Sequence, residues 1–392
     1  MAKVIVVGLG AMGSAAAQHL AERGHQVLAF DRFTPPHTMG SSHGQTRMIR
    51  QAYWEDSRYI PLVLRAYELW QRLERDSGRQ LLHITGGLVI GRSGGNLAQR
   101  SKESAEAFDL PYQILTPREL MNRFPAFTPA EDGIALWEEQ AGYLVPENCI
   151  GAQLERARIA GAKLQVDEPV VDWRAAGDGV MVRTVAGVHY ADRLVLTAGP
   201  WSAELLREML PPLNVTRQIV YWFEPKSGIA NFRDDRMPVY LMEGEPGERV
   251  LYGFPASGAA HEGVKVALHG SDEVCSPDTV DRFMRPSEEA SIRCRIERAI
   301  PSLGGRLIRT ETCLYTMTPD EHFIIDHHPM FAQVIVAAGF SGHGFKFANA
   351  IGEAIADLCI NGSSSSDLRL FAIDRFKPST SGATTTIGTN PN

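Results

Sequence analysis

The stretch that decides the fold is KVIVVGLGAMGSAAAQHLAERGHQVLAFD, residues 3–31. It opens with a β-branched run, Val4 to Val7, which is typical of a buried parallel strand. Glycines at positions 8, 10 and 13 follow, then an alanine-rich segment that ends at Gly24 and a second apolar run that stops at Asp31. Strand, glycine turn, helix, strand and acid in this order predict a Rossmann-like unit at the start of an α/β protein.

Each of these residues has a use in binding an adenine dinucleotide. Gly8 permits the tight turn, Gly10 lets the backbone approach a pyrophosphate, and Gly13 lets helix and strand pack closely. The start of the helix, which includes Met12, presents free N–H groups to the phosphates. Asp31 follows Gly13 at the distance where a carboxylate accepts from ribose hydroxyls. The pattern does not distinguish NAD from FAD, and a purely structural turn is the alternative.

Composition limits the classes of protein to which the chain can belong. Its 392 residues, 44% of them hydrophobic, predict two domains with buried cores. A net charge of −7 argues against a nucleic-acid-binding protein. The five cysteines include no CxxC pair, which predicts a reducing compartment and no zinc site. With no apolar run of about 20 residues and no signal-peptide pattern, we expect a cytoplasmic protein without a membrane partner.

An irregular loop follows the first unit, with the sequence TPPHTMGSSHGQTRMIR at residues 34–50. Its prolines and glycines exclude a helix before about Thr46. Arg47 and Arg50 would share a face if a helix or turn begins there. Two solvated arginines are the common alternative. Their apolar neighbours, Met48 and Ile49, favour cations that face the interior.

The middle of the chain alternates between helical and extended patterns. We expect helices from about Tyr59 through Leu73 and from Cys149 to Ala160, a strand broken by paired glycines at 83–91, helical structure with polar faces at 97–127, and strands at 163–166, 179–184 and 193–202. The last of these strands meets a glycine turn at Gly199, and we expect it to return to the dinucleotide sheet.

Short alternating strands between residues 215 and 270 predict an antiparallel sheet with one packed face. Lys265 and His269 would point to the same side of one strand. If that side lines a pocket, a cation and a titratable imidazole lie beside the ligand; if it faces solvent, both are ordinary surface residues. The segment 377–392 has the composition of a disordered tail.

Reactive side chains gather again between Cys313 and Phe347, where a cysteine, a tyrosine, histidines and a lysine lie among glycines. Such a pattern is typical of an active-site floor, although a surface loop followed by a strand and a helix would also fit.

Six motifs in order resemble the monomeric sarcosine oxidase family, which includes N-methyltryptophan oxidase, within the D-amino-acid-oxidase-like flavoproteins. They are the initial GxGxMG, PPHTMGSSHGQTRMIR (35–50), LYGFP (251–255), CLYT (313–316), DEHFIID (320–326) and FSGHGFKF (340–347). The resemblance implies an FAD-binding domain of residues 1–80, 146–211 and 319–376, and a substrate domain of 81–145 and 212–318. The first would be Rossmann-like and the second mostly antiparallel, so the fold class is α/β and α+β.

The resemblance also implies roles for individual residues. Cys313 would be joined through sulfur to the flavin 8-methyl carbon, and a cationic environment would favour its thiolate. Arg50 and Lys346 would pair with the substrate carboxylate. Lys265 would stabilise superoxide as reduced flavin meets oxygen. The other expected substrate-side or flavin-side residues are Tyr252, His269, Tyr315, His343, Arg47 and His43, and the further expected cofactor contacts are Ser41, Val170, Gly199, Gly342, Gly344 and Phe345.

The implied activity is the oxidation of a secondary amine of an amino acid, with FAD as cofactor and dioxygen as acceptor, by a monomer. Sarcosine or another small N-methyl amino acid is the favoured substrate, with pipecolate and fructosyl amino acids as alternatives. A flavin dehydrogenase with another acceptor, an NAD-dependent dehydrogenase and a non-catalytic flavin protein are the rival interpretations. One departure concerns the loop: the family pattern SHHGDTR is replaced by Ser42 at the first histidine and Gln45 at the acid.

Overall fold

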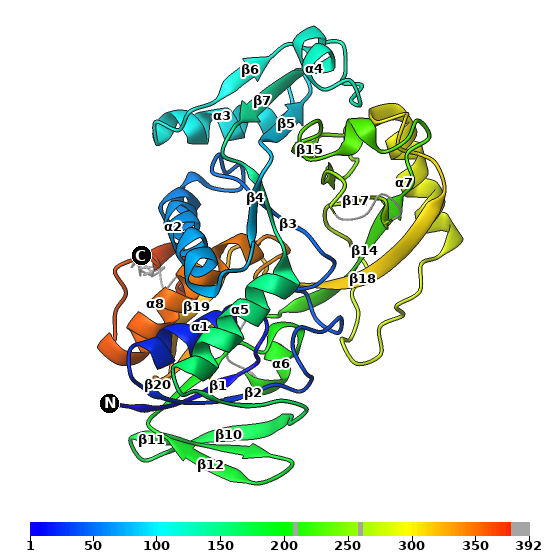
Figure 1. Cartoon of the computed structure of the whole chain (residues 1–392). Coiled ribbons are helices and arrows are strands. Elements are labelled where there is room, and N and C mark those ends of the chain that lie inside the picture. The colour runs from blue at the N-terminus through cyan, green and yellow to red at the C-terminus, as the bar shows by residue number, and fades with distance from the viewer. Residues whose placement is uncertain (207–210, 258–261, 378–392) are drawn as a thin grey trace, which may run out of the picture.

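The computed structural model describes residues 1–206, 211–257 and 262–377. A six-stranded sheet forms one half of the molecule (Figure 1). Its strands, in spatial order, are β19 (Ile324–His328), β20 (Phe331–Ala338), β13 (Arg193–Leu196), β1 (Lys3–Val7), β2 (Gln26–Phe30) and β9 (Lys163–Gln165). All neighbours pair in parallel except β19 with β20. The Rossmann-like unit and the return of the segment after Arg193 to this sheet are therefore confirmed.

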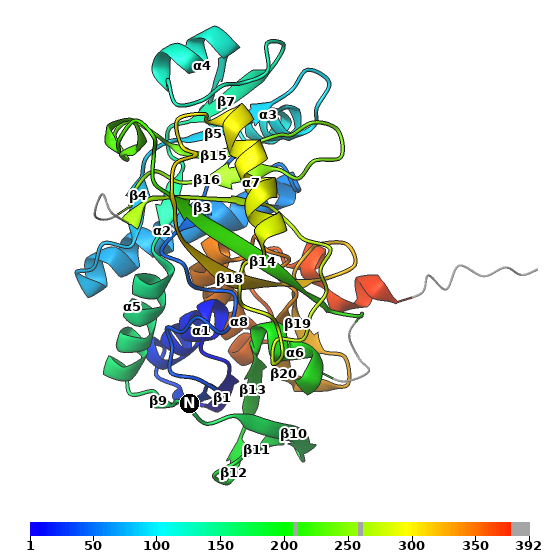
Figure 2. The same ribbon diagram turned by 90° about the vertical axis from the view of Figure 1, so that its right-hand side faces the viewer.

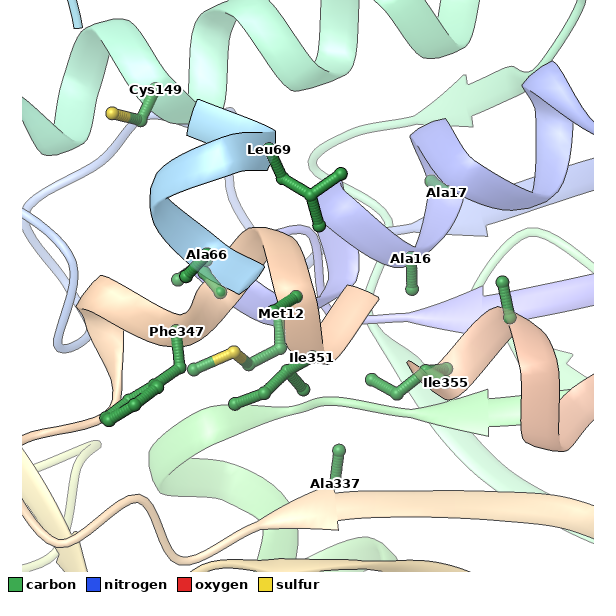
Figure 3. Close-up of a cluster of buried hydrophobic side chains, with 14 of the residues drawn as sticks. Met12, Ala16, Ala17, Ala66, Leu69, Cys149, Ala337, Phe347, Ile351 and Ile355 are labelled. Carbon is green, nitrogen blue, oxygen red and sulfur yellow. The ribbon is translucent and has the colours of Figure 1, made fainter. Parts of the chain in front are cut away.

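Both faces of this sheet are covered, which explains its continuous apolar strands. Val4 and Val6 face a core shared with α1 (Ala11–Glu22), α2 (Ile60–Ser77), α5 (Pro146–Ile159) and α8 (Ala348–Asn361). Figure 3 shows part of this core, where Met12 of α1 lies against Ile351 of α8. Ile5 and Val7 face the opposite way, towards a three-stranded sheet of β10 (Val170–Ala176), β11 (Gly179–Thr184) and β12 (Val188–Ala191).

An eight-stranded sheet forms the other half. Its order is β18 (Leu307–Met317), β14 (Asn214–Phe223), β17 (Val264–Leu268), β16 (Leu251–Gly253), β15 (Val239–Met242), β5 (Gly87–Gly91), β7 (Ile134–Glu138) and β6 (Gln113–Leu115). Only β15 and β5 pair in parallel, so the predicted antiparallel sheet is confirmed. Helix α7 (Pro286–Ala299) lies across this sheet (Figure 2) and buries Ile292 and Ile296 against one face. The other face turns towards the dinucleotide half.

One possibility left open by the sequence is excluded, and one local prediction is wrong. Residues 47–49 form a strand, β3 (Arg47–Ile49), rather than the start of a helix, because β3 pairs with β8 (Gly142–Leu144), which also pairs with β4 (Leu82–Ile84). The segment 97–127 is not helical throughout. Helices α3 (Leu97–Ala107) and α4 (Pro117–Arg123) are separated by β6, which follows Pro111, a residue that ends helices.

Of the other expectations, some agree with the structure and one concerns residues that the structure does not describe. The helices expected near Tyr59 and Cys149 are α2 and α5. All strands of the six-stranded sheet come from residues 1–80, 146–211 and 319–376, although the division into domains stays a prediction. The predicted tail lies outside the described residues, apart from Lys377. Within the described ranges, no helix is both long and apolar enough to cross a bilayer.

Candidate active site

A cavity of about 820 Å³ is lined by residues of both large sheets and of the loop after Asp31. The predicted site residues on its wall are Gly8, Gly10, Met12, Asp31, Ser41, Arg47, Arg50, Val170, Gly199, Tyr252, His269, Cys313, Tyr315, Gly342, His343, Gly344, Phe345 and Lys346. Three predicted site residues lie just behind the wall: Gly13, His43 and Lys265. Each contacts a residue that lines the cavity, namely Gly8, Cys313 and Thr46 in that order. The cavity thus brings together sequence segments that lie up to 338 positions apart, from Gly8 to Lys346.

The glycine turn leaves room at one end of the cavity. Gly8 has a φ of +90°, and a Cβ there would lie 2.4 Å from the carbonyl oxygen of Thr197. A Cβ on Gly13 would lie 1.7 Å from the carbonyl oxygen of Gly8. These two glycines are required by close backbone packing. A Cβ on Gly10 would meet nothing within 4 Å, so this position borders open space at the start of α1, as a pyrophosphate requires.

Asp31 joins the glycine turn to the end of β2. Its Oδ2 accepts from the Leu9 N–H at 2.6 Å, and its Oδ1 accepts from the Phe33 N–H at 2.8 Å. The first turn of α1 has no acidic side chain that would compete with an anion for its N–H groups. The site therefore fits an adenine dinucleotide. The free N–H groups and the open space at Gly10 suit its phosphates, and the carboxylate on the wall suits its ribose.

One face of the eight-stranded sheet carries the reactive side chains. Positions 311, 313 and 315 of β18 share that face because successive residues of a strand alternate in direction. Lys265 lies opposite Trp222 on β14, and Tyr252 of β16 lies opposite Ala267 of β17. Lys265 is therefore on the same side of the sheet as Tyr252, which lines the cavity, so of the two alternatives left open by the sequence the structure shows the pocket side and not the solvent side.

The sulfur of Cys313 lies in a cationic environment. Nη2 of Arg47 donates to Sγ at 3.1 Å, and Sγ lies 3.3 Å from the carbonyl oxygen of Ser41. Burial opposes ionisation of the thiol, but the charges of Arg47 and His43 outweigh it and lower the pKa of Cys313 to about 6. A thiolate is therefore the favoured form near neutral pH, which is the reactive form of cysteine.

Lys265 is buried behind the wall of the cavity. Its Nζ donates to the carbonyl oxygens of Gly44 at 2.6 Å and Thr46 at 2.9 Å, and lies 5.0 Å from the ring centroid of Phe254. Burial and then the nearby charge of Arg47 hold the pKa of Lys265 well below its usual value. Cys313, Glu311 and Glu147 oppose this shift, and a further anion close to Nζ would favour the protonated form of the amine.

Arg50 and Lys346 form a second cationic group with Glu55. Nη2 of Arg50 lies 2.5 Å from Oε2 of Glu55, and its guanidinium lies 4.5 Å from the Tyr53 ring centroid. Nζ of Lys346 donates to the carbonyl oxygen of His343 at 2.8 Å and lies 5.0 Å from the same ring. We call Arg50, Lys346 and Glu55 the carboxylate clamp.

The charges of the clamp depend on one another. Burial would raise the pKa of Glu55, but Arg50, His343 and Lys346 hold it at about 2. Burial lowers the pKa of Lys346 to about 7, although Glu55 opposes this shift. When Lys346 is protonated, the two cations exceed the single carboxylate by one charge. The clamp therefore favours one further anion, such as the carboxylate of an amino acid.

His343 and His269, two of the histidines on the wall, differ in their surroundings. Nδ1 of His343 lies 2.5 Å from the Tyr53 hydroxyl and Nε2 lies 3.1 Å from the carbonyl oxygen of Glu321, so both ring nitrogens are engaged. Burial lowers the pKa of His343 to about 3, which leaves its ring neutral near neutral pH. The ring of His269 lies 5.8 Å from that of Tyr315, and burial also lowers its pKa. His269 is thus a neutral imidazole on the wall.

Glycines shape the space around Tyr315. A Cβ on Gly342, which has a φ of +80°, would lie 2.2 Å from Cε2 of Tyr315, so only glycine lets this ring pack against the loop. Burial raises the pKa of Tyr315 and of Tyr252. Both phenols are therefore neutral donors on the cavity wall.

Sequence reasoning missed Glu55, Tyr53 and Glu311. Glu55 follows Arg50 by five positions in the mostly apolar run QAYWE, and an acid in such a run is a signal for a buried ion pair. Tyr53 lies beneath both cations of the clamp, and Glu311 precedes Cys313 by two positions. The role of Glu311 depends on His43, which is distant in sequence, and the role of Tyr53 depends on aromatic contacts that no pattern predicts.

Comparison with known proteins shows the family to which the chain belongs. The family model described as FAD dependent oxidoreductase matches residues 3–358. The monomeric sarcosine oxidase of Streptomyces avermitilis is 42% identical over 369 residues, which cover 94% of this chain and 96% of that protein. The N-methyl-L-tryptophan oxidase of Yersinia pestis is 35% identical, with 95% of this chain and 99% of that protein covered.

Solved structures agree with this fold. The L-proline dehydrogenase of P. horikoshii has a TM-score of 0.82 at 23% identity, covering 95% of this chain and 97% of that one. The glycine oxidase of Geobacillus kaustophilus has a TM-score of 0.79 at 21% identity, covering 96% and 99%. Together with the sequence match, they show a D-amino-acid-oxidase-like fold with an α/β half and a mostly antiparallel half. The chain belongs to the DAO family of FAD dependent oxidoreductases, and within it is similar to the monomeric sarcosine oxidases.

Proposed function

We propose that the chain is an FAD-dependent oxidase that acts on the secondary amine of an amino acid, with sarcosine or another N-methyl amino acid as the favoured substrate. The observation that carries this proposal is the carboxylate clamp on the cavity wall, next to the neutral aromatic groups of Tyr315 and His269. The names of the sequence relatives, sarcosine oxidase and N-methyltryptophan oxidase, support the same class of substrate.

The clamp binds and orients the substrate. Arg50 offers a planar cation and Lys346 a point charge to the substrate carboxylate, and Tyr53 beneath both cations limits their movement. His343 holds Lys346 through its carbonyl oxygen. A carboxylate held in this way fixes the position of the carbon atoms beside the amine, which is the positional advantage that an enzyme needs for C–H cleavage.

The amine must be neutral before a hydride equivalent leaves its α-carbon or N-methyl group. The pKa of His269, lowered by burial, makes it a neutral base that can accept the amine proton. The chemistry that FAD would supply here is uptake of the hydride equivalent and transfer of two electrons to dioxygen. The imine product is then hydrolysed by water to an aldehyde and an amine.

Two further assignments concern the other side of the cavity. Cys313 would hold the flavin through its 8-methyl carbon, supported by the lowered pKa of the thiol and by the contact of Arg47 with its sulfur. Lys265 would supply the positive charge that stabilises superoxide during reoxidation, supported by its buried position directly behind the wall of the cavity. The buried charge of Arg47 would favour an anionic, reduced cofactor.

A dehydrogenase with another electron acceptor is the main alternative. Lys265 at a buried position behind the cavity favours the oxidase, because a dehydrogenase has no superoxide to stabilise.

The test is a peroxide-coupled assay on the purified yellow protein, with sarcosine, larger N-methyl amino acids, pipecolate and fructosyl amino acids. We expect peroxide with at least one of the four groups, and flavin that stays with the chain after denaturation. Turnover with an artificial acceptor but without peroxide would favour the dehydrogenase. Flavin release on denaturation would contradict the attachment at Cys313.

A further inference from the structure

Glu311 lies beside the proposed attachment cysteine without touching it. It precedes Cys313 by two positions on β18, so the two side chains share one face of the sheet. Oε2 of Glu311 lies 3.0 Å from Nδ1 of His43, whose side chain is only 3% exposed. Its Oε1 accepts from Nη1 of Arg309 at 3.0 Å, which fixes the carboxylate from the other side.

The loop that carries His43 has no acid of its own. Gln45 stands where the family pattern SHHGDTR has aspartate, and its amide is engaged elsewhere. Its Nε2 donates to Glu262 at 3.0 Å, and its Oε1 accepts from Nε1 of Trp222 at 3.2 Å. A second carboxylate, Glu147 of α5, accepts from the backbone N–H groups of Gly44 and Gln45, and within the described part of the chain it makes no hydrogen bond to the His43 ring. Glu311 is therefore the carboxylate on the His43 ring.

The second ring nitrogen of His43, Nε2, is available to the sulfur of Cys313. Among the described residues its Nε2 is buried and has no hydrogen-bond partner. Burial would lower the pKa of His43, but the Cys313 thiolate and Glu311 raise it to about 9. A protonated imidazole between a carboxylate and a thiolate is the arrangement that lowers the pKa of a cysteine.

We propose that Glu311 is a positioning residue for Cys313: it fixes the imidazole of His43 and keeps it cationic beside the sulfur, supplying from β18 the carboxylate that the loop lacks. This inference rests on the proposed attachment of flavin at Cys313. The overall attachment replaces the thiol S–H bond and one methyl C–H bond by an S–C bond, and dioxygen takes up the two hydrogens as hydrogen peroxide. The thiolate that begins this change is the species that Glu311 favours.

Other charged and titratable groups also act on this site. They are Arg47 of β3, Glu147 of α5, Tyr252 of β16, Lys265 of β17, and Arg309 and Tyr315 of β18. Arg47 stays charged at any pH of interest, so loss of Glu311 should weaken ionisation of Cys313 rather than abolish it.

The experiment follows covalent flavin incorporation into the full-length chain produced without riboflavin. FAD is added between pH 5 and 9, and bound flavin is read from the fluorescence of the denatured chain. For Glu311→Gln we expect the midpoint of the rate profile to rise by about one pH unit and the rate at pH 7 to fall several-fold. Glu311→Asp should restore part of the wild-type profile. Glu262→Gln is the matched control, because it removes a carboxylate from Gln45 and not from His43.

Two outcomes would overturn the inference. One is an unchanged midpoint in Glu311→Gln. The other is an equal loss of rate at every pH with a lower melting temperature, which indicates a merely structural role.

Alkylation of Cys313 tests the role of Glu311 independently of whether flavin becomes attached to that cysteine. If wild-type chain binds flavin only non-covalently, the attachment is wrong, and the pH profile of Cys313 alkylation by iodoacetamide, followed by peptide mass, replaces the incorporation rate. A midpoint higher in Glu311→Gln than in wild type would still support the role of Glu311, and equal midpoints would overturn it.

Discussion

Two groups of cations border the same cavity, and they are balanced in different ways. The carboxylate clamp has an internal anion, Glu55, which opposes the loss of the proton on Lys346. Among the described residues, Nζ of Lys265 donates to two carbonyl oxygens. Burial and the charge of Arg47 depress its pKa, and Cys313, Glu311 and Glu147 oppose this shift. The difference lies in place and in the balance of charge. The clamp lines the cavity and, once Lys346 is protonated, carries one more positive than negative charge, so it can bind an anion from solution. Lys265 lies behind the wall among the charged groups around Cys313, so we expect it to act on an anion that forms in the reaction.

The largest effect should come from breaking the clamp. Arg50→Met removes one partner of a buried ion pair and leaves Glu55 uncompensated. We expect kcat/KM for the best secondary amine to fall about 10³-fold, from a loss of about 4 kcal/mol. Steady-state kinetics check this, with flavin absorbance as the control for an intact cofactor site. A loss below tenfold would mean that Arg50 does not bind the carboxylate.

Removing the internal anion should change stability in acid. The pKa of Glu55 is about 2 in the folded chain, below its ordinary value of 4.5. Because the folded pKa is depressed, its contribution is present above about pH 4.5 and is lost as pH falls towards 2. This contribution is about 3 kcal/mol.

Urea unfolding of wild type and Glu55→Gln between pH 6 and 2 measures it. The free energy of unfolding of wild type should fall relative to the variant across this window. Parallel curves would show that Glu55 is not ionised by the clamp.

A smaller effect should appear in the pH dependence of carboxylate binding, which should depend on Lys346 of the clamp and not on Lys265. The pKa of Lys346 is about 7, so the free clamp loses one positive charge as pH rises above 7. The Kd of propionate, a carboxylate without an amine, should rise up to tenfold per pH unit above 7. Titration of the flavin absorbance checks this. Lys346→Met should flatten the profile, whereas Lys265→Met should keep it; the same profile in all three proteins would rule out titration of Lys346.

Local patterns predicted the dinucleotide half well. Residues 3–31 contain their own strand, turn, helix and acid, so each step follows from neighbours in sequence. The face of β18 was also predictable in part, since Cys313 and Tyr315 lie two positions apart, as side chains on one face of a strand do. Resemblance to a family supplied the roles of Arg50, Lys346 and Lys265, which no periodicity indicates.

The parts of the fold and site that the sequence did not predict depend on strand pairs and ion pairs between residues far apart in the chain. The sequence left open a helix or turn at Arg47, but a strand forms there because β8, almost a hundred residues later, supplies its hydrogen bonds. Glu311 and His43 are 268 positions apart, and only the fold shows that the carboxylate missing from the loop comes from β18. An ion pair of this kind leaves no spacing signal in the sequence.

The central claim is that Lys346 serves substrate binding and Lys265 serves reoxidation by dioxygen. Stopped-flow measurement of the two half-reactions in Lys265→Met and Lys346→Met tests it directly. We predict that Lys265→Met slows reoxidation of the reduced protein by about 100-fold or more while reduction by the amine changes little. Lys346→Met should raise the amine concentration needed for half-maximal reduction and leave reoxidation unchanged. Equal effects of Lys265→Met on both half-reactions would contradict the account.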